Sequence, residues 1–164
     1  MHCKNCDQDG HYAISCKSRI QRPIKKVSIK KTKPKKPKAH TRGWYIKKLD
    51  AVYSQYIRQM YADKNGMIKC STCPDIKHIK EMQNGHYESR GHYPTRWYDK
   101  NCHPQCYKCN CILRGNYTVY AIFMINKYGD GILEQLRYLT TTQRKYTLCE
   151  IKELIDFYTL ELKL

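Results

Sequence analysis

Hydrophobic residues recur at helical spacing in three parts of the chain. The first part is residues 45–62, the second follows Asn116 and ends near Gly129, and the third starts at Thr147. Apolar positions three and four residues apart predict a helix in each part. These positions are Ile46, Leu49, Val52, Tyr53, Tyr56, Ile57 and Met60, then Tyr120, Ile122, Phe123, Ile125 and Tyr128, and finally Ile151, Leu154, Ile155, Tyr158 and Leu162. Thr147 and Glu150 have the spacing of a capping box, which predicts the start of the last helix.

The stretch from residue 67 to residue 110 has no such period. It comes after a turn signal at Asn65-Gly66 and is rich in Cys, His and Gly. A segment of this kind cannot be held by a hydrophobic core alone. We therefore expect a small α+β domain over residues 44–164, in which a metal stabilises the irregular part.

Two further segments precede this domain. Residues 1–16 are a Cys/His cluster, and residues 17–43 are a basic linker. From Lys17 to Lys48 there are 14 Lys and Arg and no acidic residue. Proline and like charges should keep the linker extended without a partner. We predict phosphate-backbone binding by its lysines, with a solubilising tail or localisation signal as the alternative. These lysines are Lys30, Lys31, Lys33, Lys35, Lys36 and Lys38.

Composition narrows the choice of partner and compartment. The 164 residues carry 31 Lys and Arg against 14 Asp and Glu, a net charge of +17, which favours nucleic acid as the partner. No apolar run approaches the roughly 18 residues of a membrane-spanning helix, so no membrane partner is expected. The polar start Met1-His2-Cys3 is unlike a secretory signal. A cytoplasmic location is therefore expected, and paired cysteines then indicate metal binding.

The N-terminal cluster has the spacing of a zinc site. Its potential ligands are Cys3, Cys6, His11 and Cys16, and Gly10 precedes the histidine. In so short a segment the metal has to serve as the core. The spacing resembles the CCHC zinc knuckle of retroviral nucleocapsid proteins, which implies a grip on single-stranded nucleic acid, with Tyr12 able to stack on a base. A purely structural zinc site is the alternative.

A second zinc site is expected inside the domain. The pairs Cys70-x2-Cys73 and Cys106-x2-Cys109 supply four thiolates that would join the two ends of the irregular segment. Three cysteines remain. Cys111 is close enough to compete as a ligand, Cys149 is expected to be a core thiol, and Cys102 has no assigned role.

The residues between the two pairs resemble an HNH, or ββα-metal, nuclease. His86, Asn101 and Asn110 stand at the three positions of that motif. The resemblance implies that His86 takes a proton from water, Asn101 orients its ring, and Asn110 helps hold a catalytic Mg2+ or Mn2+. Gly85 replaces the usual aspartate before the histidine. Candidates for the missing ligand are Asn84, Glu88, His92 and His103, and His103 is also a candidate catalytic, DNA-contacting or structural residue.

A wider set of positions resembles the phage lambda Rap/NinG family over roughly residues 44–164. They are Tyr56-Ile57-Arg58, Cys70-x2-Cys73, Gly85-His86-Tyr87, Pro94, Arg96, Asn101-Cys102-His103-x-Gln105-Cys106-x2-Cys109-Asn110, Gly115-Asn116, Tyr120 and Lys145-Tyr146-Thr147. The resemblance implies a recombination endonuclease acting on Holliday junctions and D-loops, and a glycine before the catalytic histidine. This chain departs from it in Asn84, where His is implied, and in its zinc knuckle.

Three functions agree with these features of the sequence. The leading one is a metal-dependent, structure-selective DNA endonuclease, in which Arg90 and Arg96 flank the hairpin and would contact phosphates. The second is a non-catalytic nucleic-acid-binding accessory protein with a degenerate site. The third is a zinc-dependent protein-interaction module. The symmetry of a branched junction would suit a homodimer.

Overall fold

The computed structural model describes Asp9 and residues 39–163. Residues 39–164 form a unit of their own, and the fold is the fold of that unit. Apart from Asp9, the predicted knuckle at residues 1–16 lies outside the described residues, as does most of the linker at residues 17–43. The first helix, α1 (Arg42–Met60), begins inside the segment expected to be linker, where the Thr41 hydroxyl accepts a hydrogen bond from the Trp44 N–H.

The three helices expected from periodicity are all present. Besides α1 they are α3 (Tyr117–Tyr128) and α5 (Leu148–Glu161). Both halves of the capping box at the start of α5 form between Thr147 and Glu150, as predicted. A further helix, α4 (Ile132–Thr141), was not predicted, although Ile132, Leu133, Leu136 and Leu139 have helical spacing; it buries Ile132 and Leu136.

The segment expected to be irregular contains two antiparallel hairpins. The first pairs β1 (Met67–Lys69) with β2 (Ile76–His78). The second pairs β3 (Met82–His86) with β4 (Cys102–Cys106), in a register that places His86 opposite Cys102. Short helical turns separate and extend these strands: α2 (Tyr93–Arg96), the 3-10 turn η1 (Asp99–Asn101) and the π-helical turn η2 (Lys108–Ile112).

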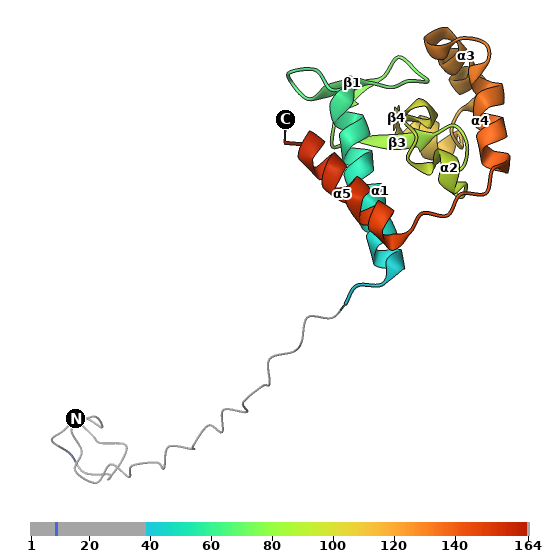
Figure 1. Ribbon diagram of the computed structural model, residues 1–164. Helices are drawn as coiled ribbons and strands as arrows, with labels where there is room; N and C mark the ends of the chain where they lie inside the picture. Colours follow the sequence, from blue (N-terminus) through green and yellow to red (C-terminus); the bar gives the residue numbers. More distant parts are fainter. Residues whose placement is uncertain (1–8, 10–38, 164) are drawn as a thin grey trace. The chain divides into compact units, whose positions relative to one another are not determined.

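The β3–β4 hairpin lies between two helical layers (Figure 1). On one side α1 and α5 run alongside each other and enclose a core with Trp97 and Cys102. On the other side α3 and α4 form a separate core against Tyr87 and Tyr98. A third, small core surrounds the cysteines at the end of the hairpin. The fold is thus a mixture of helices and small sheets, in which both faces of the hairpin are covered.

Candidate functional site

Four cysteines come together where the two hairpins meet. The sulfur atoms of Cys70, Cys73, Cys106 and Cys109 lie within 4.8 Å of one another. The Cys73 and Cys106 sulfurs are 3.7 Å apart. Four sulfurs at about 2.3 Å from a tetrahedral zinc ion lie about 3.8 Å apart, so the cluster fits zinc. The four-cysteine site predicted from the two CxxC pairs is thus geometrically ready to bind metal.

Neighbouring donors prepare these sulfurs for a metal. The Cys106 N–H donates to Cys70 Sγ at 3.3 Å, and the Asn116 side-chain amide donates to Cys109 Sγ at 3.9 Å. Burial by itself raises the pKa of Cys70, but the Cys106 N–H and the Thr72 donors outweigh it and lower that pKa to about 7. Because the thiolate is the form that binds metal, these contacts favour coordination by Cys70, whereas burial raises the pKa of Cys73 and of Cys106.

The remaining cysteines of the described domain stand apart from this cluster. Cys102 is fully buried in the core beneath α1. Cys111 is exposed and donates to Gln83 Oε1 at 3.2 Å, so it does not compete for the metal. The expectation that Cys149 is a core thiol is wrong, because it lies on the exposed face of α5 beside Glu153.

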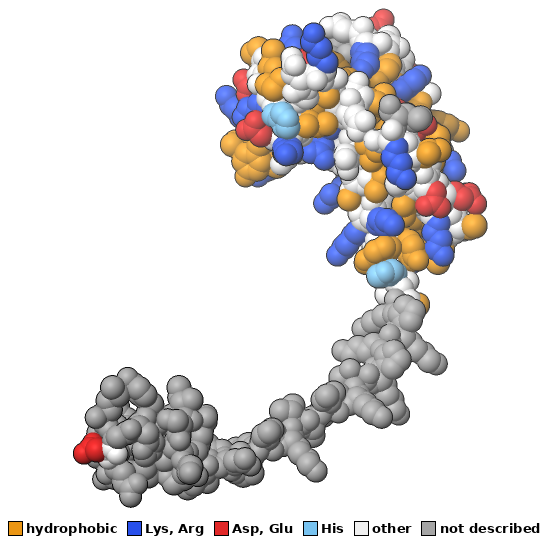
Figure 2. Space-filling view, turned by 90° about the vertical axis from the view of Figure 1, so that its left-hand side faces the viewer, with side chains coloured by type: hydrophobic (Ala, Val, Ile, Leu, Met, Phe, Trp, Pro, Cys, Tyr) orange, Lys and Arg blue, Asp and Glu red, His pale blue; other side chains and the backbone are white. Residues whose placement is uncertain are grey.

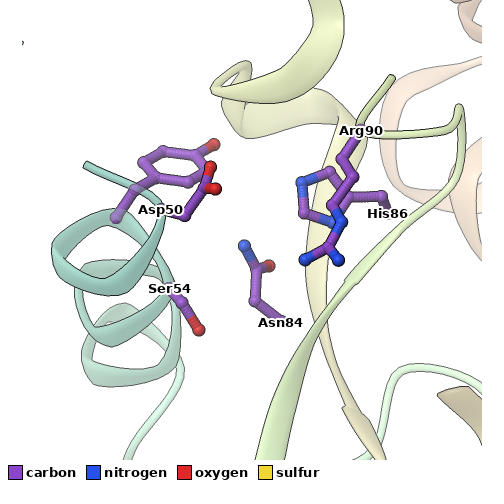
Figure 3. Close-up of a pocket in the computed structure, with 6 residues that line it drawn as sticks. Asp50, Ser54, Asn84, His86 and Arg90 are labelled. Atoms are coloured by element: carbon purple, nitrogen blue, oxygen red, sulfur yellow. The ribbon is translucent and has the colours of Figure 1, made fainter. Parts of the chain in front are cut away.

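His86 lies in a small pocket between α1 and β3 (Figure 3). Asp50, Tyr53 and Ser54 of α1 form one wall, and Asn84, His86 and Arg90 form the other. Asn84 extends between the helix and His86, with its amide oxygen toward His86 and Arg90. That oxygen is buried and has no hydrogen-bond partner among the described residues. A buried acceptor without a partner is costly, so it marks a position where an incoming hydrogen-bond donor would be favoured.

The His86 ring is held by the main chain. Its Nε2 lies 3.0 Å from the Arg96 carbonyl oxygen. A carbonyl can only accept, so Nε2 carries the hydrogen and Nδ1 is the basic nitrogen of the neutral ring. Burial lowers the pKa of His86, although the Arg96 carbonyl and the Asp50 carboxylate oppose the shift. His86 is consequently neutral at pH 7, as a general base must be.

Asn101 is fully buried and contacts only the backbone with its side chain. Its Oδ1 accepts from the Glu88 N–H at 2.7 Å, and its Nδ2 donates to the carbonyls of Glu88 and Thr95 at 3.0 and 2.9 Å. The expectation that this amide orients the His86 ring directly is therefore not met. Asn101 instead fixes the loop that links the two strands, and so acts on His86 only through the backbone.

Asn110 lies on the other face of β3. Because successive strand residues point to opposite faces, Asn84 and His86 face α1 whereas Gln83 and Gly85 face η2. The Asn110 amide donates to Gln83 Oε1 at 2.7 Å. At position 85 the space for a side chain is filled by Gln105, whose Oε1 would lie 2.1 Å from a Cβ. The structure thus separates Asn110 from His86 rather than bringing them together.

His103 is enclosed and has no access to the pocket. Its ring nitrogens each lie 2.9 Å from a tyrosine hydroxyl, Nδ1 from Tyr120 and Nε2 from Tyr128. Burial, with a contribution from Lys127, lowers the pKa of His103 to about 3. Of the roles that the sequence left open, this geometry supports the structural one, and it does not support a catalytic or metal-binding role for His103.

The two arginines expected to contact phosphate differ in their freedom. Arg90 is exposed and lines the pocket. Arg96 is tied to Asp50 by two hydrogen bonds of 2.9 and 2.6 Å, and its side chain is 16% exposed. Its charge is therefore already compensated, and of the two only Arg90 offers a free guanidinium. Asp50 itself was not predicted from the sequence; the one available signal was that it is the only acidic residue of α1.

Basic residues also cover the rest of the domain. Residues 39–164 contain 19 Lys and Arg and 12 Asp and Glu. On the face in Figure 2, Lys and Arg side chains are spread over the described domain instead of being confined to one patch. The predicted contacts of Tyr12 and of the linker lysines Lys30, Lys31, Lys33, Lys35, Lys36 and Lys38 lie outside the described residues, as do the knuckle ligands Cys3, Cys6, His11 and Cys16.

Comparison with known families gives a match along nearly the whole chain. Residues 2–164 fit the family described as "Bacteriophage Lambda NinG protein". This chain belongs to the NinG family. That result agrees with the NinG part of the resemblance drawn from the motifs around His86 and the cysteine pairs.

The relatives are phage proteins of the same name. Over 134 residues the chain is 25% identical to the ninG proteins of Escherichia phage 933W, Escherichia phage lambda and Salmonella phage P22. The match covers 81% of this chain but 64%, 63% and 63% of those proteins, so the chain spans less than two thirds of their length. No solved structure matches it. Among the described helices of this NinG-family chain, none is long and apolar enough to cross a membrane.

Proposed function

We propose that this NinG-family chain is a DNA endonuclease of the HNH, or ββα-metal, type that acts on branched recombination intermediates such as four-way junctions and D-loops. The observation that carries the proposal is the His86 pocket: a neutral imidazole held through Nε2 beside an unpartnered amide oxygen and a free arginine. A general base, an acceptor and a phosphate-binding cation are the parts that phosphodiester hydrolysis requires.

The local fold supports the same assignment. His86 ends the first strand of an antiparallel hairpin, the second strand ends at Cys106, and the helical turn η2 comes next. Strand, strand, metal ligands and helical turn occur in the order of the ββα-metal motif. Zinc at the four cysteines would fix the end of β4 and thereby the register that sets His86 against Cys102.

The side chains of the pocket suit a hydrolysis in which His86 accepts the proton of the attacking water. A water between His86 and Asn84 would give one proton to His86 Nδ1 and donate its second hydrogen to Asn84 Oδ1. Its oxygen then forms a bond to phosphorus as the P–O bond to the leaving sugar oxygen breaks, and solvent protonates that oxygen. Arg90 would balance the charge on the phosphate oxygens.

The catalytic Mg2+ or Mn2+ that the HNH type implies does not fit the described residues well. The face toward η2 offers the neutral amides of Gln83, Gln105 and Asn110 and the Cys111 thiol. On the α1 face, the Asp50 carboxylate already accepts from Arg96 and from the Trp97 indole. Magnesium usually takes one or two carboxylates together with substrate phosphates. The described residues therefore do not form a complete Mg2+ site, and in the scheme above only the side chains of His86 and Asn84 contact the attacking water.

A branched DNA partner is supported by charge and by chemistry. The excess of basic residues in the domain and the lysines of the linker suit a polyanion. The N-terminal zinc knuckle would add a contact to single-stranded nucleic acid, and a homodimer would match the symmetry of a four-way junction. In this scheme the knuckle and linker bring the DNA to the domain, and the His86 pocket cuts it.

The missing free carboxylate favours one alternative, a non-catalytic recombination accessory protein that binds DNA through the same scaffold. The test is nicking of a labelled four-way junction by the full zinc-loaded chain, with Mg2+, with Mn2+ and with neither. His86→Ala should abolish nicking and keep junction affinity, whereas His78→Ala, on β2 outside the pocket, should leave both unchanged. Binding without nicking by every variant would support the accessory protein. Salt-insensitive association, or none, would instead indicate a protein-interaction module.

A further inference from the structure

One carboxylate connects the two walls of the His86 pocket. Asp50, on α1, accepts from three donors in the segment after Arg90: Arg96 Nε at 2.9 Å, Arg96 Nη2 at 2.6 Å and Trp97 Nε1 at 3.0 Å. The Arg96 side chain is 16% exposed and that of Asp50 is 27% exposed. A two-pronged arginine–carboxylate contact, partly shielded from water, fixes geometry as well as charge.

Both functional side chains of the opposite wall depend on the residue that Asp50 holds. The Arg96 carbonyl accepts the hydrogen of His86 Nε2 at 3.0 Å. The third guanidinium nitrogen, Nη1, donates to the carbonyl of Arg90 at 2.9 Å. Arg96 therefore fixes the ring of the general base with its backbone, and the main chain of the phosphate-binding arginine with its side chain.

We propose that Asp50 is a positioning residue of the candidate active site: acting through Arg96, it sets the ring orientation of His86 and the place of Arg90. This inference rests on the proposed nuclease function for its catalytic consequence, but the contact itself does not. Asp50 is the only acidic residue in α1, a helix that otherwise carries basic, apolar and neutral polar side chains. Its position thus couples the helix to the hairpin at the point where the chemistry is expected.

The alternative role for Asp50 is simply to neutralise a buried arginine. The two roles differ in what they predict for the His86 ring. A positioning role requires that loss of the carboxylate release the Arg96 carbonyl and allow the Nδ1–H form of the ring to appear. A purely neutralising role would change stability and leave the ring nitrogens as they are.

The experiment measures the imidazole 15N shifts of His86 and the nicking kinetics in the full zinc-loaded chain. Asp50→Asn keeps the side-chain size and removes the charge, and Arg96→Lys keeps the charge but removes the two-pronged contact. Asp130→Asn, in the exposed loop before α4, is the matched control for net charge. We expect both pocket variants to mix the two ring tautomers, to lower kcat by about 10- to 100-fold, and to weaken junction binding no more than Arg90→Ala does. The control should match the wild type.

The outcomes separate this inference from the proposed function. Folded Asp50→Asn protein with a wild-type ring and wild-type kcat would overturn the positioning role. A wild-type chain that cuts no junction, together with a disturbed His86 ring in Asp50→Asn, would refute the nuclease and retain the positioning role. If Asp50→Asn does not fold, the milder Arg96→Lys decides: unchanged tautomer and kcat in that variant overturn the inference.

Discussion

Gln105 fills the space in which a side chain on Gly85 would begin. A Cβ at position 85 would lie 2.1 Å from Gln105 Oε1 and 2.7 Å from its Cδ, and Gln105 is fully buried, with its amide nitrogen bonded to Thr72 and Gly115. The glutamine cannot move aside without breaking those bonds. The residue before His86 is thus glycine for a steric reason, and an aspartate in its place would meet the same obstacle.

Gly85→Ala should therefore destabilise the domain, by about 1–3 kcal/mol, as expected for an overpacked core. Thermal unfolding of the zinc-loaded chain measures the effect. Gly43→Ala is the control, because a Cβ there meets only Thr41 Oγ1 at 3.9 Å and lies in the first turn of α1. Equal melting temperatures for Gly85→Ala and the wild type would mean that the Gln105 side chain can adopt another conformation at no cost in stability.

Metal content should distinguish the cysteines. We expect two zinc ions per chain, one at the knuckle and one at the four-cysteine cluster. Cys73→Ser should lose one zinc and loosen the end of the β3–β4 hairpin, since the cysteines that would hold the metal make up most of that small core. Cys111→Ser, just beyond the ligand Cys109, should keep both zinc ions. Zinc analysis of the purified proteins decides, and loss of zinc on Cys111→Ser would assign that thiol to the cluster.

Nicking should depend on pH through His86. A base is active when neutral, and the pKa of His86 is lowered by burial from its ordinary value of 6.5. The rate should therefore be nearly constant above pH 6.5 and fall only at lower pH, as the ring takes up a proton. Single-turnover nicking at pH values from about 4.5 to about 8 measures the profile. A midpoint above 6.5 would show that the ring does not have the buried surroundings of the pocket.

Acid should destabilise the domain through His103. Its pKa is about 3 in the folded chain and 6.5 in an unfolded one, so the unfolded state binds the proton first as the pH falls. The stability is complete above pH 6.5 and declines between 6.5 and 3, by up to about 4 kcal/mol for this residue. Urea unfolding at about pH 7 and about pH 4.5 tests it. His103→Gln cannot titrate there, so its stability should depend less on pH; an unchanged pH dependence would contradict the assignment.

Arg90 should contribute to DNA affinity as a phosphate contact. Arg90→Ala is expected to weaken binding to all sequences alike and to reduce the slope of log K against log salt by about 1. Arg137→Ala, on α4 outside the pocket, removes the same charge and serves as the comparison. Fluorescence anisotropy with a labelled junction over roughly 50 to 300 mM salt gives both slopes. Identical slopes for the two variants would contradict a phosphate contact by Arg90.

Hydrophobic periodicity and cysteine spacing were the sequence features that correctly predicted helices and the four-cysteine cluster. The helices α1, α3 and α5 result from their apolar positions, and the capping box at Thr147 results from two residues. The four cysteines came together because a zinc site needs all of its ligands at one point. In each case the information is local, or the chemistry itself demands proximity.

The arrangement around His86 depended on features that spacing does not record. Asn110 has the expected number of residues between it and the cysteines, yet it faces Gln83, because strand residues alternate between faces. Asn101 is at its expected position, but its three hydrogen bonds go to the backbone. Asp50 lies 46 residues before its partner Arg96, and nothing in the local sequence links the two.

The contact between α1 and α5 has a consequence for how the chain matures during translation. The cysteine cluster closes a loop between residues separated by 33 positions, whereas α5 is the last of the described helices to leave the ribosome. Contacts between distant segments form late in folding. The cysteine hairpin can thus assemble on a nascent chain and pack against α1, while the core that α1 shares with α5 is completed only after α5 has been made. A polypeptide interrupted before α5 would have the cysteine cluster and the Asp50 contacts, yet would leave exposed the side of the core that Ile151, Ile155 and Tyr158 cover.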